Sequence, residues 1–291
     1  TGPLAGLVSI TASCAYVDPS DAILIGSIGG IISGSTIVLL EKILTNFFVK
    51  PNQKPQDAIV ETASFIYLQF LIQPLAFFIG YGVGAELFPE YKDLIVNWNV
   101  FLVILLFLIF DDMAQYWWHR TCHNVPLLYN LHRPHHEAEY MSIRIVFRNN
   151  PIYFLLMPGL YFSGILVFLG GLKVYAFYII IKQAVIFGAH TDLRWDKKLY
   201  EIKFLQPLMW LLERTISTPA THWAHHGKHM VDPATHYKGN YGNLLFLWDI
   251  IFGTAKITRK YPQEIGVENL NEASAAYQIL WPFVKAPENN Q

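Results

Sequence analysis

Apolar residues in this chain gather in long runs instead of alternating with polar ones. A bilayer core of about 30 Å requires roughly 20 apolar residues in a helix. Five stretches reach or approach that length: Ala22–Leu40, Ala58–Phe88, Val100–Trp118, Ile152–Leu169 and Leu172–Gly188. The pattern therefore predicts an all-α fold with several transmembrane helices.

Two of these stretches carry more detail. Ala58–Phe88 is longer than one span needs and has Pro74 near its middle, which fits either one kinked span or a re-entrant helical hairpin. The fourth and fifth stretches are joined only by Gly170 and Gly171, and so short a connection predicts an antiparallel pair.

The polar segments 119–150 and 194–260 follow the third and fifth stretches and are rich in Lys and Arg. The antiparallel pair places both segments on one side of the membrane, and basic segments favour the cytoplasmic side. Several tryptophans near the predicted boundaries fit an aromatic belt: Trp117, Trp118, Trp195, Trp210 and Trp223. We expect an integral, multi-pass protein with both polar segments on the cytoplasmic face.

Composition supports lipid as the main solvent of the chain. Hydrophobic residues make up 53% and charged residues 15%, whereas soluble domains carry about a quarter charged residues. The net charge of −1 gives no basic surplus for binding nucleic acid. Cys14 and Cys122 lie far apart, so no disulfide framework is expected. The chain begins at Thr1 without a signal-peptide pattern, which fits a fragment or a processed form.

All eleven histidines fall between positions 119 and 236. His119 and His123 are four residues apart, and two HxxHH clusters follow: His132, His135, His136 and His222, His225, His226. Residues three or four apart share one face of a helix. Each HxxHH cluster can thus offer two imidazoles in one direction and a third beside them. With His190, nine nitrogen ligands would suit two metal ions that keep open positions.

The ligand type alone does not choose the metal, because imidazole binds Fe, Zn, Cu and Ni. A zinc protease requires HExxH, and the string from His136 to Tyr140 lacks the second histidine. A bis-histidine haem would leave most of these side chains unused. Nothing fixes the spacing of His229 and His236, so each is more typical of a solvated or supporting histidine than of a ligand.

The histidine strings resemble those of the fatty acid hydroxylase and sterol desaturase superfamily of membrane di-iron enzymes. The matching strings are His119-Arg-Thr-Cys-His123, His132-Arg-Pro-His135-His136, Gly188-Ala-His190-Thr-Asp-Leu-Arg194, His222-Trp-Ala-His225-His226 and the segment from Asn240 to Thr254. The resemblance covers about residues 60–260. It implies transmembrane helices carrying a cytosolic, helical, histidine-rich cap, and nine histidine ligands to two iron ions. Related 2-hydroxylases have a further histidine where this chain has Arg194, so the resemblance does not supply a tenth ligand, although His229, His236 or a water could substitute.

Two carboxylates are candidates for supporting roles. Asp112 precedes His119 by two helical turns on nearly the same face, so it could accept the second N–H of a ligand histidine. An ionisable group at the inner end of a span is costly unless it is used. Asp249 lies in the matched C-terminal segment and could support a histidine or a contact of the fold. No residue is predicted to be catalytic in its own right.

Residues 4–40 differ in character from the rest and resemble an internal stretch of the ammonium transporter family. The resemblance covers one loop and one span, without that family's paired pore histidines, and a Gly-rich packing helix explains the segment equally well. We therefore divide the chain into an N-terminal membrane segment (1–50), a hydroxylase-like di-iron domain (51–260) and a peripheral tail (261–291).

The interpretation that unites these patterns is a membrane-bound oxygenase. It would use O2 to hydroxylate or desaturate a C–H bond of a lipid such as a sterol or a fatty acyl chain. No flavin, ferredoxin or cytochrome pattern occurs in the chain, so the electrons would come from a separate protein that basic residues could dock. The alternative is a non-catalytic transporter or metal-handling protein, which would have histidines lining its spans instead of clustering beyond them.

Overall fold

The computed structural model describes residues 41–43, 45–270 and 273–284. Within these ranges the regular elements are helices, and the only β-type pairings are two isolated bridges. The chain forms two compact units. The described part of unit 1 comprises residues 66–115 and 154–184, and that of unit 2 comprises residues 41–43, 45–65, 116–153, 185–270 and 273–284.

In the part of the chain that the structure describes, four helices are long and apolar enough to cross a membrane: Pro55–Leu87, Val100–Asn124, Pro151–Phe168 and Leu172–His190. They confirm the all-α, multi-pass prediction for the second to fifth apolar stretches. The first stretch, Ala22–Leu40, lies outside the described residues. Two spans extend beyond their predicted ends because the polar histidine strings continue the same helices.

The long second stretch is one span instead of a re-entrant hairpin. It consists of α3 (Pro55–Tyr67), the π-helix η1 (Leu68–Ile72) and α4 (Gln73–Leu87). Pro74 lies in the first turn of α4, directly after the π-helix. Proline lacks the N–H that an α-helix would use there, and the wider π turn before it lets the helix continue. The third span likewise joins α5 (Val100–Phe107) to α6 (Met113–Asn124) through the π-helix η3 (Leu108–Asp112).

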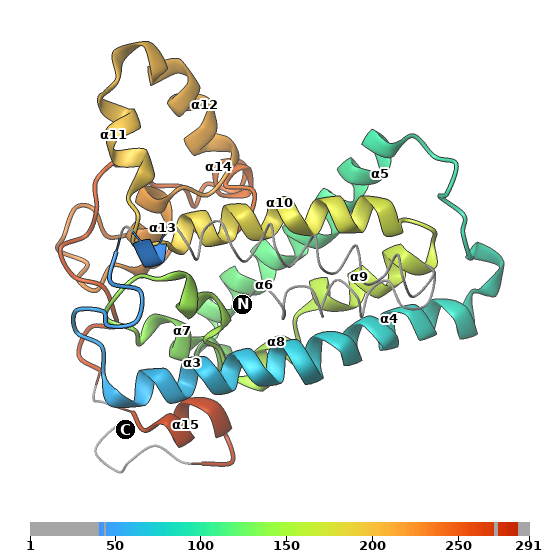
Figure 1. Ribbon diagram of the computed structural model, residues 1–291, viewed down its shortest axis with the longest axis horizontal. Coiled ribbons are helices and arrows are strands. Elements are labelled where there is room, and N and C mark those ends of the chain that lie inside the picture. The colour runs from blue at the N-terminus through green and yellow to red at the C-terminus, as the bar shows by residue number, and fades with distance from the viewer. Residues whose placement is uncertain (1–40, 44, 271–272, 285–291) are drawn as a thin grey trace. The chain divides into compact units, whose positions relative to one another are not determined.

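Unit 1 is built around the packing of α4 against α9 (Pro158–Phe168), which lie side by side in Figure 1. Two glycines permit this close approach. A Cβ on Gly80 would lie 2.1 Å from the carbonyl oxygen of Tyr161, and one on Gly164 would lie 2.0 Å from that of Phe77. Small residues at helix contacts are a common way to pack transmembrane helices.

Unit 2 contains all eleven histidines. Its remaining elements are mostly short: α7 (Pro126–His136), η4 (Ile143–Phe147), α11 (Trp195–Glu201), η5 (Lys203–Leu205), α12 (Gln206–Thr215), α13 (Pro219–His226), α14 (Leu247–Ile251) and α15 (Ala275–Leu280). The last residues of α6 and of α10 (Leu172–His190) also belong to it.

Buried polar contacts hold the two ends of unit 2 to its centre. Glu41 is fully buried and accepts hydrogen bonds from Ser142 Oγ at 2.7 Å and Thr191 Oγ1 at 3.2 Å, and it pairs with Lys50. In the tail, Gln278 on α15 accepts a hydrogen bond from the buried Arg148, at 2.9 Å. Glu41, Lys50 and α15 are thus packed into the unit that carries the histidines.

Candidate metal centre

Four helices of unit 2 bring nine histidines together. The short helices α7 and α13 each carry one HxxHH cluster, α6 carries His119 and His123 near its end, and α10 ends at His190. The ligand nitrogens fall into two groups, each with its members within 4.8 Å of one another. The first group is His119, His123, His132, His136 and His225, and the second is His135, His190, His222 and His226.

The two HxxHH clusters contribute to the groups in a crossed manner. From α7, His132 and His136 enter the first group, whereas His135 enters the second. From α13, His222 and His226 enter the second group, whereas His225 enters the first. Residues four apart project from one side of a helix, and the neighbouring residue is turned by about 100°. Each cluster therefore supplies a pair to one group and a single imidazole to the other.

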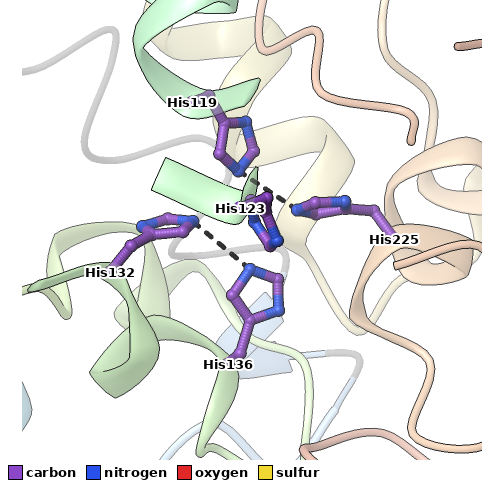
Figure 2. A group of neighbouring side chains, drawn as sticks. All are labelled: His119, His123, His132, His136 and His225. Carbon is purple, nitrogen blue, oxygen red and sulfur yellow. Dashed lines mark hydrogen bonds between the residues drawn. The ribbon is translucent and has the colours of Figure 1, made fainter. Parts of the chain in front are cut away.

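Figure 2 shows the first group, with imidazoles from α6, α7 and α13 converging on one another. The Nε2 atoms of His119 and His225 lie 3.1 Å apart, and those of His132 and His136 lie 3.3 Å apart. In the second group, the Nε2 of His190 lies 2.8 Å from that of His222 and 3.3 Å from that of His135.

In five of these histidines the other ring nitrogen, Nδ1, donates a hydrogen bond to a fixed oxygen. The acceptors of Nδ1 are the carbonyl of Tyr241 for His119, Asn149 Oδ1 for His132, the carbonyl of Ile145 for His135, that of Ile186 for His190 and that of Gly239 for His225, at 2.7–2.8 Å. A carbonyl oxygen only accepts, so each Nδ1 carries a proton. Nε2 of the neutral ring is then a bare lone pair, the form in which histidine binds a metal.

These protonation states leave lone pairs facing one another. His119 and His225 both donate through Nδ1, and so do His135 and His190, yet each pair meets through Nε2. No proton is available on either nitrogen to bridge the gap, so the two lone pairs repel unless a cation lies between them. A metal ion removes this repulsion, because nitrogens about 2 Å from one ion lie roughly 3 Å apart when at right angles. The donor set therefore fits two metal ions.

Protonation of the histidines does not relieve this repulsion in place of a metal ion. Burial, and then the neighbouring imidazoles, hold the pKa of His135, His222 and His226 well below the usual value of histidine. The pKa values of His132, His136 and His225 are lowered by the same two causes. Burial disfavours the charged form, so these six rings are neutral, which is the form that binds a metal ion.

Local signals fix the ends of the histidine helices. Thr218 caps α13 in a capping box with Thr221, and Pro219 occupies the first turn, where its missing N–H costs nothing. The loop after α13 is held by Asn240, whose side chain donates to the carbonyl of Thr221 at 2.9 Å and accepts from Lys256 N at 2.7 Å. These two hydrogen bonds fix the carbonyls of this loop relative to α13.

Asp249 supports a histidine indirectly. It is fully buried and accepts the backbone N–H groups of Tyr241 at 2.8 Å and Gly242 at 2.6 Å. The carbonyl of Tyr241 in turn accepts from Nδ1 of His119. Burial raises the pKa of Asp249, whereas its hydrogen bonds with Thr254, Gly242 and Tyr241 lower it. Asp249 thus fixes the loop that orients a ligand candidate.

Other predicted supporting residues lie elsewhere. Nδ1 of His119 donates to the carbonyl of Tyr241, and support of a ligand histidine by Asp112 stays a prediction. His229 binds Glu268 and Glu264 at the exposed side of unit 2, and its hydrogen bond to Glu268 raises its pKa. His236 lies 3.1 Å from the carbonyl of Thr254. Neither histidine belongs to the two groups. Arg194 stacks over Trp223 and Tyr261, at 4.4 and 4.8 Å from the ring centres.

The groups that orient the histidines were not found from the sequence. Asn149 follows His132 by 17 residues, a separation that no helical or loop motif specifies. The other four acceptors are backbone carbonyls, which every residue possesses, so their positions leave no mark in the sequence.

Comparisons with known proteins place this site in a family context. A family profile described as fatty acid hydroxylase matches residues 104–254, which include the nine histidines of the two groups. A second profile, the ammonium transporter family, matches residues 1–45, as the resemblance of residues 4–40 indicated. No solved structure matches the chain.

Several curated relatives share this region. Alkylglycerol monooxygenase from Danio rerio is 29% identical over 145 residues, and that from Xenopus tropicalis is 31% identical over 147 residues. Each alignment covers 49% of this chain and 28% of the relative. Lathosterol oxidase from Mus musculus is 26% identical over 174 residues, covering 59% of this chain and 51% of that protein. The chain thus spans little more than a quarter of the first of these relatives.

Proposed function

The chain belongs to the fatty acid hydroxylase family, and from this premise we propose that it is a membrane-bound di-iron oxygenase that hydroxylates or desaturates a C–H bond of a lipid. The observation that carries the proposal is the pair of histidine groups in which Nε2 lone pairs face one another. This arrangement is costly without a cation and favourable with one.

We assign the two ions to the two groups. His119, His123, His132, His136 and His225 would hold one, and His135, His190, His222 and His226 would hold the other. Imidazole alone does not select iron, and iron is chosen because of the family. Two iron ions would supply the redox chemistry by which O2 oxidises an unactivated carbon.

The protein's own part is to fix the ligands and keep the site dry. Eight of the nine histidines are buried, and five are oriented by a hydrogen bond to Nδ1. Such contacts to the second nitrogen set the tautomer and raise the basicity of the ligand. We place the histidine groups on the cytoplasmic face because the basic segments surround them in the sequence.

The substrate class follows from the family and the four apolar helices. The named relatives act, by their names, on an alkylglycerol and on the sterol lathosterol. Both are lipids, and an enzyme built on membrane spans can receive a lipid from the bilayer. We therefore propose a lipid substrate, with these two compounds as the first probes, and a separate electron-transfer protein as partner.

Metal analysis of the purified, nanodisc-embedded protein tests the centre. About two iron ions per chain are expected after anaerobic reconstitution. His225→Ala should weaken the first group and His222→Ala the second, each lowering the metal content, whereas His229→Ala is the matched control outside both groups. Equal metal content in all four proteins, or none in any, would overturn the assignment.

A single-turnover experiment tests the reaction without the redox partner. The iron-loaded protein is reduced with dithionite, mixed with an alkylglycerol or lathosterol, and then exposed to ¹⁸O2. A lipid product that carries the label, or a desaturated lipid formed only with O2, supports the oxygenase. Iron binding without any lipid oxidation across a panel of lipids would favour a metal-handling protein.

A further inference from the structure

Helix α12 of unit 2 has an apolar outward side, and its two buried residues are Met209 and Glu213. Its inward side carries Glu213, whose side chain is 1% exposed and forms two hydrogen bonds with Arg259, at 2.8 and 2.9 Å. Its outward side carries Leu208, Trp210 and Leu211, which are all more than half exposed. A helix on a water-soluble surface has the opposite arrangement, with its apolar stripe facing the core.

The neighbouring helix α14 also has apolar residues on its outward side and buries Trp248 and Asp249. Asp249 is fully buried and holds the loop beside His119, whereas Ile250 and Ile251 face outward, the latter 56% exposed. The helices α12 and α14 are in contact, and Figure 1 shows them close together in unit 2. We group the exposed apolar residues of these two helices and of the turn before α12 under the name α12–α14 surface: Phe204, Leu208, Trp210, Leu211, Leu247, Ile250 and Ile251.

This surface continues toward the end of a candidate membrane span. Phe252 directly follows α14, and its ring centre lies 4.9 Å from that of Trp117. Trp117 is exposed and lies near the end of the span Val100–Asn124, with the guanidinium of Arg120 5.0 Å above its ring. A tryptophan with an arginine at the end of a span is typical of the boundary between membrane and water.

The charges beside the surface complement lipid phosphates. Lys197 and Lys198 on α11 are exposed, and Lys203 is exposed next to Phe204, which is 81% exposed in the turn between α11 and α12. One exposed acid, Glu201, lies among them. Apolar residues rimmed by lysines are the pattern of helices that lie in the plane of a membrane interface.

We propose that the α12–α14 surface is immersed in the interfacial region of the bilayer, with Lys197, Lys198 and Lys203 at the level of the phosphates. Unit 2 would then hold the membrane by this surface in addition to the spans. The proposal is independent of the metal and of the reaction, because it depends only on which side chains face outward.

Site-directed spin labelling of the full chain in nanodiscs tests the proposal. A nitroxide is attached to Leu211→Cys or Ile251→Cys, with Cys14 changed to Ser and the buried Cys122 retained. Val231→Cys, on a loop of unit 2 and 91% exposed, is the matched control. Collision rates with O2, which concentrates in lipid, and with a nickel chelate, which stays in water, give the depth of each label.

We expect O2 collisions to exceed nickel collisions at positions 211 and 251 and the reverse at 231, in variants that melt at the temperature of the parent. Nickel access at 211 equal to that at 231 would place the surface in water and overturn the proposal. Exclusion of both reagents in discs holding several chains, relieved in discs holding one, would identify a second copy as the occupant and also overturn it.

In discs with anionic lipid, changing the three lysines to Gln should make the label at 211 shallower, and an unchanged depth would remove the lysines from the proposal.

Discussion

His135 and His190 face each other through their Nε2 atoms at 3.3 Å, while the Nδ1 of each donates to a backbone carbonyl. Neither nitrogen between them carries a proton, so the contact is repulsive until a cation enters. The metal-free fold therefore holds part of its centre in an unfavourable arrangement, and metal binding should stabilise the protein as well as complete its site.

This relationship predicts that His190→Ala lowers the stability of the iron-loaded protein more than that of the metal-free protein, and so reduces the stabilisation that iron provides. Removal of one imidazole relieves the repulsion and at the same time deletes a ligand. Thermal unfolding with and without iron measures both effects. His236→Ala is the control, because this histidine lies outside both groups. An equal gain in melting temperature on adding iron to the parent and to His190→Ala would contradict the assignment of His190.

A second prediction concerns Asp249, which holds the loop that orients His119. In Asp249→Asn, an amide NH2 would face a backbone N–H that now donates to the carboxylate. The loop should loosen, and iron affinity should fall by about 10- to 100-fold, the usual effect of losing a group that orients a ligand. Competition with a metal chelator measures the affinity.

The matched control for this prediction is Asp232→Asn. Asp232 also accepts two backbone N–H groups, those of Ala234 and Gln263, but the loop that orients His119 begins at Tyr241 and is held by Asp249. Comparable loss of iron affinity in both variants would mean that Asp249 acts on folding in general instead of on His119.

The sequence predicted the parts of this structure that depend on short-range patterns. The length of an apolar run determines whether a helix can span the bilayer, so four spans were located without knowledge of their packing. The HxxHH spacing likewise determines that His132 and His136 share a helical side. The assignment of His135 and His225 to opposite groups depends on how α7 and α13 approach each other, which no local pattern encodes. The same is true of Asn149 and of the carbonyl acceptors.

Acidification should destabilise the metal-free protein. Burial and neighbouring rings lower the pKa of the three histidines of α7 in the folded state. They likewise lower the pKa of the three histidines of α13: His222, His225 and His226. An unfolded histidine has a pKa of about 6.5. Between the two values the unfolded chain binds more protons, so the free energy of unfolding falls as the pH drops below about 6.5 and is restored above it.

Thermal unfolding of the metal-free protein across this pH window measures the effect, and protons should also displace bound metal there because they compete for the same nitrogens. His229→Ala should not diminish the destabilisation by acid, since Glu268 raises the pKa of His229, so that its protonation stabilises the folded state, and this side chain lies apart from the two groups. A melting temperature that is constant from about pH 7.5 to about pH 5 would show that the six rings are not neutral in the folded state.

The last prediction concerns an ion pair inside unit 1. Lys182 Nζ lies 2.5 Å from Asp111 Oδ2, which also accepts the hydroxyl of Tyr178 at 2.6 Å, and both charged side chains are at most 10% exposed. Both residues lie within candidate spans. Breaking such a pair leaves one charge buried without its partner, at a cost of roughly 3–5 kcal/mol, whereas replacing both charges by neutral groups costs much less.

Asp111→Asn should therefore lower the melting temperature strongly, and the double variant Asp111→Asn, Lys182→Met should recover most of the loss. Asn keeps an oxygen that can accept from Tyr178, so the comparison isolates the charge. Glu86→Gln, on the exposed side of α4, is the control and should have little effect. The single variant Lys182→Met completes the comparison. If the loss of stability in the double variant equals the sum of the losses in the two single variants, the residues are energetically independent. In that case the ion pair would not explain why two charged residues are stable inside the membrane spans.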